Sequence, residues 1–178
     1  FTRLTLLFSF ALTLAACGGQ KSPSGKTALT LQSCRLEGVS VEARCGKLEV
    51  FENRETNSGR KIALNIAVIP SVSANPQVDP IVFFAGGPGQ AAVKLGQNAF
   101  QILHKARRER EIILVDQRGT GKSNPLNCND KNKNLSLAEK LVDPDSTKEM
   151  QACLQKLDAA PEHYTTPNAV ADLEDVRN

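Results

Sequence analysis

The sequence is poor in aromatic residues, with seven Phe, one Tyr and no Trp among 178 residues. It also lacks a large excess of charge, because 22 basic residues oppose 19 acidic ones and leave a net charge of +3. A balance so close to neutral gives no reason to expect nucleic acid as a partner. No internal repeat is visible, and the length is sufficient for one domain with a hydrophobic core. The composition therefore predicts an ordinary globular domain.

The sequence also lacks an apolar run long enough to span a bilayer, which needs about 20 residues. The longest apolar run, residues 4–16, follows the basic residue Arg3 and fits the apolar region of a secretory signal. It ends in Leu14-Ala15-Ala16-Cys17-Gly18, which resembles the cleavage box of bacterial lipoproteins. That resemblance implies a lipid on Cys17. The alternative is an ordinary signal peptide with a chance cysteine.

These features divide the chain into three parts. We expect a lipoprotein-type signal peptide over residues 1–16, a flexible tether over 17–33 and a folded domain over 34–178. We also expect a clipped amino end, because the chain starts at Phe1 and its only methionine is Met150. The predicted location is the bacterial cell envelope, with a lipid anchor holding the exported chain to the periplasmic or extracellular face of a membrane.

Metal-ligand motifs are missing as well. The sequence contains no Cys-x-x-Cys pair, and His104 and His163 stand at no ligand spacing from any cysteine, so we expect no metal and no other cofactor. Besides Cys17 there are four cysteines, an even number that suggests disulfides outside the cytosol. Three pairings are possible, with free buried cysteines as the alternative. We favour the two pairs that close local loops, Cys34–Cys45 and Cys128–Cys153.

Hydrophobic periodicity predicts a sheet with helices between its later strands. Residues 48–54 and 61–69 are β-rich and flank turn-forming residues at 56–59, which predicts an antiparallel hairpin. The short apolar runs 81–84 and 112–115 are typical of buried central strands. The pattern predicts helices over 90–111, with Ala92, Leu95, Ala99, Ile102, Leu103 and Ala106 on one face, in two weaker stretches within 135–161, and from 168 onward.

Two glycine-rich loops follow the two apolar strands. The first is Ala85-Gly86-Gly87-Pro88-Gly89, and the second is Asp116-Gln117-Arg118-Gly119-Thr120-Gly121-Lys122-Ser123. Two strands joined by a helix form a βαβ unit, which brings both loops to the carboxyl edge of the sheet. That edge is where open α/β sheets place their ligand sites.

Nucleotide binding is one interpretation of these loops. A phosphate-binding P-loop would need Gly at position 116, but the residue there is Asp116, which argues against this motif. A dinucleotide site fits the spacing Gly-x-Gly-x-x-Ala at residues 87–92, with Asp116 as the ribose ligand. Against it, Pro88 has no N–H to offer a pyrophosphate, and Asp116 comes later than the usual spacing of about 20 residues. A tight turn without chemistry is a further alternative.

An oxyanion hole is the interpretation we favour. Acyl transfer needs backbone N–H groups aimed at a developing negative oxygen. Glycines let a carbonyl approach these groups closely, and Pro88 would stiffen the turn.

The same residues resemble a known enzyme family. The loop at residues 85–89 looks like the His-Gly-Gly-Pro-Gly loop of α/β-hydrolases of the proline iminopeptidase and tripeptidyl aminopeptidase family. Residues 116–123 are similar to the Asp-Gln-Arg-Gly-x-Gly-x-Ser segment of that family. Residues 164–166 and 169–177 resemble the helix before its nucleophile strand, and Cys128 and Cys153 resemble its exported members.

The resemblance implies an α/β fold, here the amino-terminal part of an α/β-hydrolase, in which an antiparallel hairpin leads into a parallel sheet with flanking helices. It implies a serine aminopeptidase, often with proline preference, acting on a peptide or a small ester or amide. Gly87, or failing that Gly86, would donate one oxyanion hydrogen bond. Asp116 and Arg118, with Gln117 and Gly119 in the same loop, would support the site.

Two departures from the family pattern stand out. Ala85 replaces the histidine that opens the glycine loop, and no serine lies in Gly-x-Ser-x-Gly. Ser123 lies in the wrong loop, and both histidines come too early for the order Ser, Asp, His. We therefore expect a fragment that stops before the nucleophile and is inactive alone. A non-catalytic lipoprotein binding module and a dinucleotide-binding oxidoreductase are the alternative functions.

Overall fold

The computed structural model describes residues 29–87, 89–128 and 146–178. The predicted signal peptide, Cys17 and most of the predicted tether lie outside the described residues, as do Pro88 and the chain from 129 to 145.

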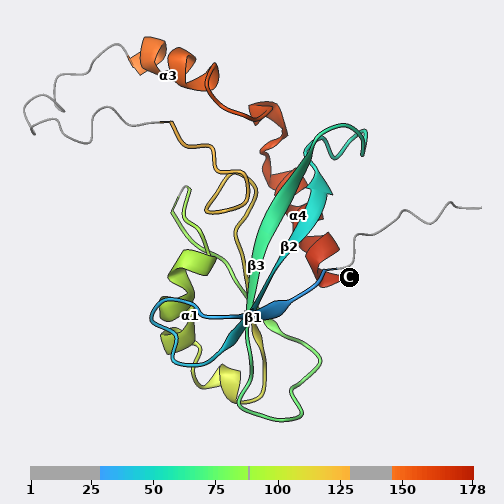
Figure 1. Cartoon of the computed structure of the whole chain (residues 1–178), viewed down its shortest axis with the longest axis vertical. Helices are drawn as coiled ribbons and strands as arrows, with labels where there is room; N and C mark the ends of the chain where they lie inside the picture. The colour runs from blue at the N-terminus through green and yellow to red at the C-terminus, as the bar shows by residue number, and fades with distance from the viewer. Residues whose placement is uncertain (1–28, 88, 129–145) are drawn as a thin grey trace, which may run out of the picture.

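Five strands form one sheet (Figure 1). They are β1 (Gln32–Cys34), β2 (Ala43–Phe51), β3 (Lys61–Ile69), β4 (Ile81–Phe83) and β5 (Ile112–Val115). The helical segments are η1 (Val93–Leu95), α1 (Gly96–Ile102), η2 (Ala106–Arg108), α3 (Ser146–Leu154), η4 (Pro161–His163) and α4 (Thr166–Arg177).

The β2–β3 hairpin is the longest pairing of the sheet, and it confirms the hairpin expected from the sequence. The Asn53 side chain accepts hydrogen bonds from the Glu55 and Thr56 amides at 3.0 and 3.2 Å, which shapes the turn. Asn57 and Gly59 both adopt positive φ, the conformation that such a turn needs. The turn residues thus fix the pairing in which Glu49 faces Ala63 and Phe51 faces Lys61.

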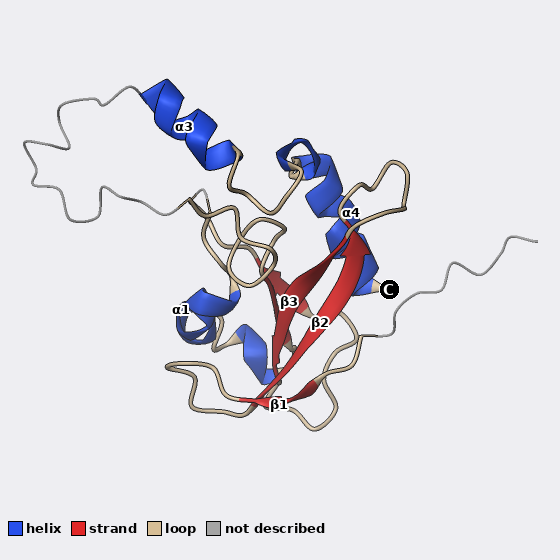
Figure 2. Ribbon diagram, turned by 45° about the horizontal axis from the view of Figure 1, so that its top comes forward, coloured by secondary structure: helices blue, strands red, loops and turns tan. Residues whose placement is uncertain are grey.

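The hydrophobic core has two halves, one on each face of the sheet. Because side chains alternate along a strand, Leu64 and Ile66 of β3 point to one face and Ala67 and Ile69 to the other. The first face also holds Leu48, Val50 and Val115 and is covered by Leu173 and Val176 of α4. The second holds Ile112 and Leu114 and is covered by Ala92, Ala99 and Phe100 at η1 and α1. Figure 2 shows these two helices on either side of the strands.

The predicted α/β-hydrolase arrangement is wrong. The strand order is β1-β2-β3-β5-β4, and only β4 and β5 run parallel. The β1–β2, β2–β3 and β3–β5 pairs are antiparallel, so the sheet is mixed and mostly antiparallel. A parallel sheet needs a crossover connection for every pair. The described residues contain one such crossover, from β4 through α1 to β5, and this leaves a single parallel pair.

Three local predictions also need correction. β4 is an edge strand, with Val82 41% exposed, although its apolar sequence predicted a central position. The helix predicted over 90–111 divides into η1, α1 and η2, and Ile102 is 70% exposed instead of buried. β1 begins at Gln32, inside the segment predicted as tether. Short apolar runs thus identify strands without fixing their place in the sheet.

Both favoured disulfides are present. Cys34 pairs with Cys45 and Cys128 pairs with Cys153, with Cα–Cα distances of 5.8 and 5.4 Å. Disulfides persist in oxidising compartments, so the pairs indicate a location outside the cytoplasm. Within the described part of the chain, no helix is both long and apolar enough to cross a membrane.

The core predicts a contrast between two truncations. Leu64 is fully buried at the centre of β3, so Leu64→Ala should lower the free energy of unfolding by about 2–5 kcal/mol. Val78 is 99% exposed, so Val78→Ala should change it by less than about 0.5 kcal/mol. Urea denaturation followed by circular dichroism measures both. Equal effects would show that Leu64 is not in the core.

Candidate functional site

The glycine loop after β4 is open to solvent. Gly86 and Gly87 are exposed, and Gly87 adopts a φ of 86° that favours glycine. The amide of Gln90 donates to the Gly87 carbonyl at 3.3 Å and closes a turn. Among the described residues, neither the Gly86 nor the Gly87 amide donates a hydrogen bond within the chain. Within the described part of the chain, these two donors therefore have no acceptor.

Asp116, at the end of β5, ties the downstream end of the glycine loop to the sheet. The carboxylate is buried and accepts from the Val93 amide at 2.9 Å, where η1 begins. It also accepts from the Asn65 side chain at 2.8 Å and from the Lys122 amide at 3.1 Å. With these three bonds made inside the protein, the carboxylate is occupied as a brace and does not serve as a ribose ligand.

The second glycine-rich loop closes on itself. The Gly119 amide donates to the Ser123 carbonyl at 2.8 Å, and the Ser123 amide donates to the Thr120 carbonyl at 2.8 Å. The Ser123 hydroxyl is fully buried, donates to the Asp116 carbonyl at 2.6 Å and accepts from the Asn65 amide at 2.8 Å. Ser123 is therefore a structural residue, and the amides of this loop are not arranged to cradle a phosphate.

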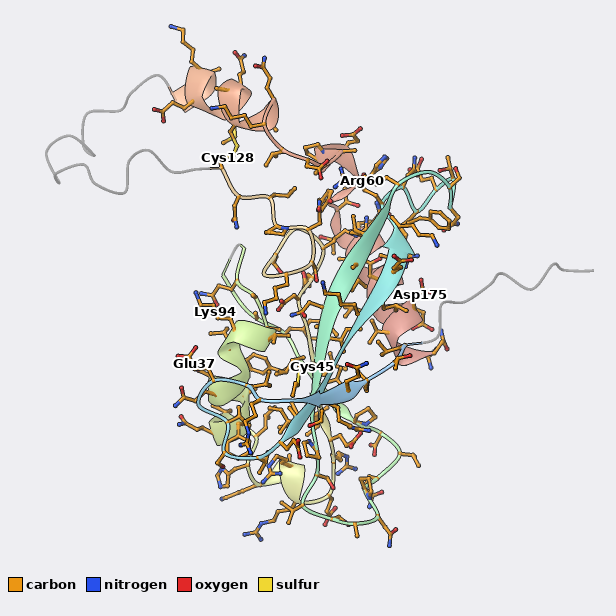
Figure 3. All side chains as sticks on the ribbon, in the orientation of Figure 1. Glu37, Cys45, Arg60, Lys94, Cys128 and Asp175 are labelled. Atoms are coloured by element: carbon orange, nitrogen blue, oxygen red, sulfur yellow. A yellow bond between two sulfur atoms is a disulfide. The ribbon has the colours of Figure 1, made fainter. Side chains whose placement is uncertain are left out.

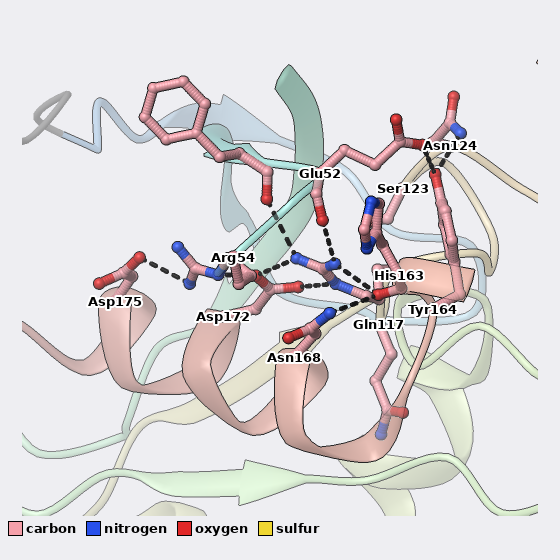
Figure 4. Close-up of polar contacts among 12 residues, drawn as sticks. Glu52, Arg54, Gln117, Ser123, Asn124, His163, Tyr164, Asn168, Asp172 and Asp175 are labelled. Atoms are coloured by element: carbon pink, nitrogen blue, oxygen red, sulfur yellow. Dashed lines mark hydrogen bonds and ion pairs between the residues drawn. The ribbon is translucent and has the colours of Figure 1, made fainter. Parts of the chain in front are cut away.

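Arg118 forms a buried clamp between three parts of the chain (Figure 4). Its guanidinium makes a two-point hydrogen bond to the Asp172 carboxylate of α4, with N–O distances of 2.7 and 2.8 Å. It also donates to three carbonyls, those of Phe51 and Glu52 at the end of β2 and of His163 in η4. A planar guanidinium suits this task because its donors are fixed in one plane. We call this group the Arg118 clamp.

The charges of the clamp are almost wholly removed from water. Arg118 is 5% exposed and Asp172 is 2% exposed. Burial raises the pKa of Asp172 above its ordinary value, while the hydrogen bonds and positive charge of Arg118 oppose that rise. Arg54 adds a second ion pair, with its Nε 3.1 Å from the same carboxylate. The Asp172 carboxylate is thus held between two cations, which offset the cost of its burial.

A second polar cluster lies beside the clamp and joins the hairpin to the chain before α4. The buried Glu52 carboxylate accepts from the Tyr164 hydroxyl at 2.8 Å and from the Ala160 amide at 3.1 Å. The Asn124 side chain donates to the Tyr164 hydroxyl at 2.6 Å, and the Arg60 guanidinium pairs with Asp158 at 2.7 Å. Burial, together with the hydrogen bond to Glu52, raises the pKa of Tyr164 to about 12. We call these residues the Glu52 cluster.

A hollow of about 340 Å³ opens between the end of β4 and α4. Its wall combines apolar side chains with a few polar ones, and includes Phe84, Gln117, Tyr164, Thr166, Val170 and Leu173. The Gln117 side chain points away from the Arg118 clamp (Figure 4). Two apolar side chains of this wall, Phe84 just after β4 and Val170 of α4, are 57% and 59% exposed.

The structure brings the residues of the two predicted loops together. The glycine loop, Asp116 and residues 117–119 share the carboxyl edge of β4 and β5, as the sequence predicted. His104, which the sequence excluded from a catalytic triad, is exposed, and its Nδ1 lies 2.9 Å from the Gln101 carbonyl oxygen. No group of side chains able to hold a metal ion occurs within residues 29–87, 89–128 and 146–178.

The sequence did not predict the polar partners of Arg118 and Tyr164. Glu52 and Tyr164 meet across 112 positions of sequence, and Arg118 and Asp172 across 54. No local spacing encodes such pairs. The available signal was Asp172 itself, an acidic residue next to the apolar stripe formed by Val170, Leu173 and Val176.

Comparison with protein-family models and with curated proteins finds no match to this chain. The site must therefore be interpreted from its own geometry.

The clamp predicts a large loss of stability when Arg118 is replaced. Arg118→Met leaves Asp172 buried with a weaker set of partners and should lower the free energy of unfolding by about 3 kcal/mol. Arg177→Met is the matched control, because Arg177 is 68% exposed and its pair with Glu174 is on the surface. The control should cost less than about 0.5 kcal/mol in urea denaturation. Similar small effects for both variants would contradict the clamp.

The Glu52 cluster predicts a high pKa for Tyr164. Tyr164 is the only tyrosine and tryptophan is absent, so the ultraviolet absorbance of tyrosinate reports this residue alone. The folded protein should titrate at about 12 against 10.0 for an unperturbed tyrosine. Because the folded pKa is the higher one, the stabilisation from protonated Tyr164 is complete below pH 10 and is lost as the pH rises through about 12.

The same titration identifies the cause. Glu52→Gln removes the acceptor charge and should lower the Tyr164 pKa, although burial keeps it above 10.0. Glu49→Gln, on the exposed side of β2, should leave it unchanged. A Tyr164 pKa that is the same in both variants would rule out the contribution of Glu52.

Proposed function

We propose that this chain carries the oxyanion-binding loop of a serine hydrolase that releases residues from the amino termini of peptides. The observation that carries the proposal is the pair of exposed amides at Gly86 and Gly87, at the end of an edge strand. Two motifs support the choice of enzyme class. Residues 85–89 and 116–123 resemble the corresponding loops of proline iminopeptidases and tripeptidyl aminopeptidases.

The geometry of the loop suits an oxyanion. A developing negative oxygen is stabilised by donors that are already in place before the reaction. Here the pairing of β4 with β5 holds the chain before the loop, and the Val93–Asp116 hydrogen bond holds the chain after it. Gly86 has open space where a side chain would be. A substrate carbonyl can therefore approach Gly86 without meeting a side chain at that position.

The remaining catalytic groups would come from polypeptide outside this sequence. The sequence has no serine in Gly-x-Ser-x-Gly, and Ser123 is buried in a structural role. The outer edge of β4 has no strand partner among the described residues and ends beside the glycine loop. A strand added there would bring a serine next to Gly87. The serine would attack the scissile carbonyl, a histidine would transfer the proton, and the oxyanion would accept from the Gly87 amide.

The cellular setting in this proposal is the bacterial envelope. The disulfides indicate an oxidising compartment, and the residues around Cys17 resemble a lipoprotein cleavage box. We place the protein on a membrane surface through a lipid on Cys17, with peptides or small esters and amides as substrates.

The proposal is tested on the protein encoded by the whole reading frame. A strand and Gly-x-Ser-x-Gly should follow Asn178 within about 20 residues, in keeping with the strand–turn–helix context of that motif. A fluorophosphonate probe should label its serine, and aminoacyl-amide substrates should be cleaved. The 178-residue chain alone should show no turnover. A stop codon directly after Asn178 would favour a non-catalytic binding module, and cofactor absorbance on purification would favour an oxidoreductase.

Two matched glycine variants test the loop in that protein. Gly87→Ala places a side chain at a φ of 86° and 3.1 Å from Gln90, which displaces the amide and should lower kcat by about 10²-fold. Gly59→Ala imposes similar strain at a φ of 80° in the hairpin turn, where nothing lies within 4 Å, and should leave kcat unchanged. If both variants retain kcat, the oxyanion role of this loop is wrong.

A further inference from the structure

We propose that the Cys128–Cys153 disulfide is a redox-sensitive latch on α3, whereas Cys34–Cys45 is a permanent part of the core. Figure 3 shows the contrast in position, with Cys45 over the centre of the sheet and Cys128 away from it, near α3. The inference does not depend on the proposed enzymatic function, because it concerns a different part of the molecule.

The Cys34–Cys45 pair is protected by the structure around it. It joins β1 to β2, whose ladder pairs Gln32 with Cys45 and Cys34 with Ala43. Both cysteines are half-buried, and Cys45 packs against the core on the α1 side. The loop that this disulfide closes is itself packed, because Val39 is buried in that core and Leu36 lies against Gly96. A thiol therefore has less access to this pair than to an exposed cysteine.

Among the described residues, no strand pairing and no core cluster includes Cys128 or Cys153. Cys128 is exposed and Cys153 is half-buried at the end of α3. The exposed positions of α3 include apolar side chains, with Met150 60% exposed and Leu154 48% exposed. Figure 1 shows α3 standing apart from the sheet. A dissolved or protein-borne thiol can therefore reach Cys128 in the folded protein.

The segments that flank the disulfide in the sequence are held to the rest of the protein by other contacts. On one side of the disulfide, Asn124 donates to the Asp158 carbonyl at 3.2 Å and to the Tyr164 hydroxyl at 2.6 Å. Asp158, which follows Cys153 in the sequence, also forms an ion pair with Arg60 of the hairpin. The Glu52 cluster thus joins the chain before Cys128 to the chain after Cys153. Opening the disulfide would release α3 from Cys128 and leave the sheet, α1 and α4 in place.

The reaction is a thiol–disulfide exchange with a dithiol reductant. A thiolate of the reductant attacks Sγ of Cys128 and the S–S bond breaks, with the electron pair leaving on Sγ of Cys153, which then takes a proton. The second reductant thiolate attacks the mixed disulfide and releases Cys128 as a thiol. The protein gains two electrons and two protons, and the reductant becomes a cyclic disulfide. Exposure selects Cys128 as the sulfur attacked first.

The first experiment measures the reduction rate of each pair in the oxidised folded chain. Samples treated with dithiothreitol are alkylated at intervals and the modified cysteines are identified by mass spectrometry. Cys128–Cys153 should be reduced at least about tenfold faster than Cys34–Cys45, since Cys128 is exposed whereas both cysteines of the second pair are half-buried in paired strands. With glutathione, a monothiol, the mixed disulfide should appear on Cys128. Equal rates, or faster reduction of Cys34–Cys45, would overturn the proposal.

The second experiment tests whether the disulfide acts as a latch. Amide hydrogen exchange is compared between the oxidised chain and the Cys128→Ser/Cys153→Ser double variant. Exchange in α3 should rise in the variant while β3 and β5 keep their protection. The Cys34→Ser/Cys45→Ser variant is the control and should instead lose protection in β1 and β2. Unchanged exchange in α3, or a loss of protection in β3, would contradict a latch that acts on α3 alone.

Discussion

The buried pair of Arg118 and Asp172 is the interaction on which the rest of the structure depends. A single guanidinium joins the end of β2, the loop after β5, the η4 turn and the middle of α4. An isolated buried charge would be very costly, but here each donor direction finds a carboxylate or a carbonyl oxygen. The Arg118 clamp therefore sets where α4 lies on the sheet, and with it the wall of the hollow beside β4.

Asp116 does the same work on the opposite side of β5. Its carboxylate fixes the start of η1, the Asn65 side chain and the turn at Lys122. Two neighbouring loops are thus held by two buried ionic side chains that are separated by a single residue. In the glycine loop, the Gly86 and Gly87 amides donate no hydrogen bond to any residue that the structure describes. A rigid support with unused donors is the arrangement that an oxyanion site requires.

The parts of the fold that depend on local sequence could be predicted. The turn residues at 56–59 identified the hairpin, the apolar run at 112–115 identified β5 with its observed bounds, and short loops identified both disulfides. Features that depend on distant partners could not. β4 has a central-strand sequence and an edge position, because neighbours and not residues decide where a strand lies.

The candidate site divides in the same way. The glycine loop and Asp116 could be recognised as motifs in the sequence. Close approach to a backbone requires glycine, and a carboxylate directly after a strand can accept hydrogen bonds from neighbouring backbone amides. Glu52, Tyr164 and the role of Asp172 were invisible, since each depends on a contact made only after the chain folds. The mostly antiparallel sheet was not predicted, because the resemblance of the motifs implied a parallel sheet. Among the described strands only β4 and β5 are parallel.

The most direct test of the account is a crystal structure of the protein encoded by the whole reading frame after reaction with a peptidyl phosphonate. The phosphonyl oxygen stands in for the oxyanion of the tetrahedral intermediate. The account predicts this oxygen about 3 Å from the Gly87 amide nitrogen, with Asp116 and Arg118 in the contacts described above. A phosphonyl oxygen that faces solvent or a different loop, with Gly86 and Gly87 unoccupied, would contradict it.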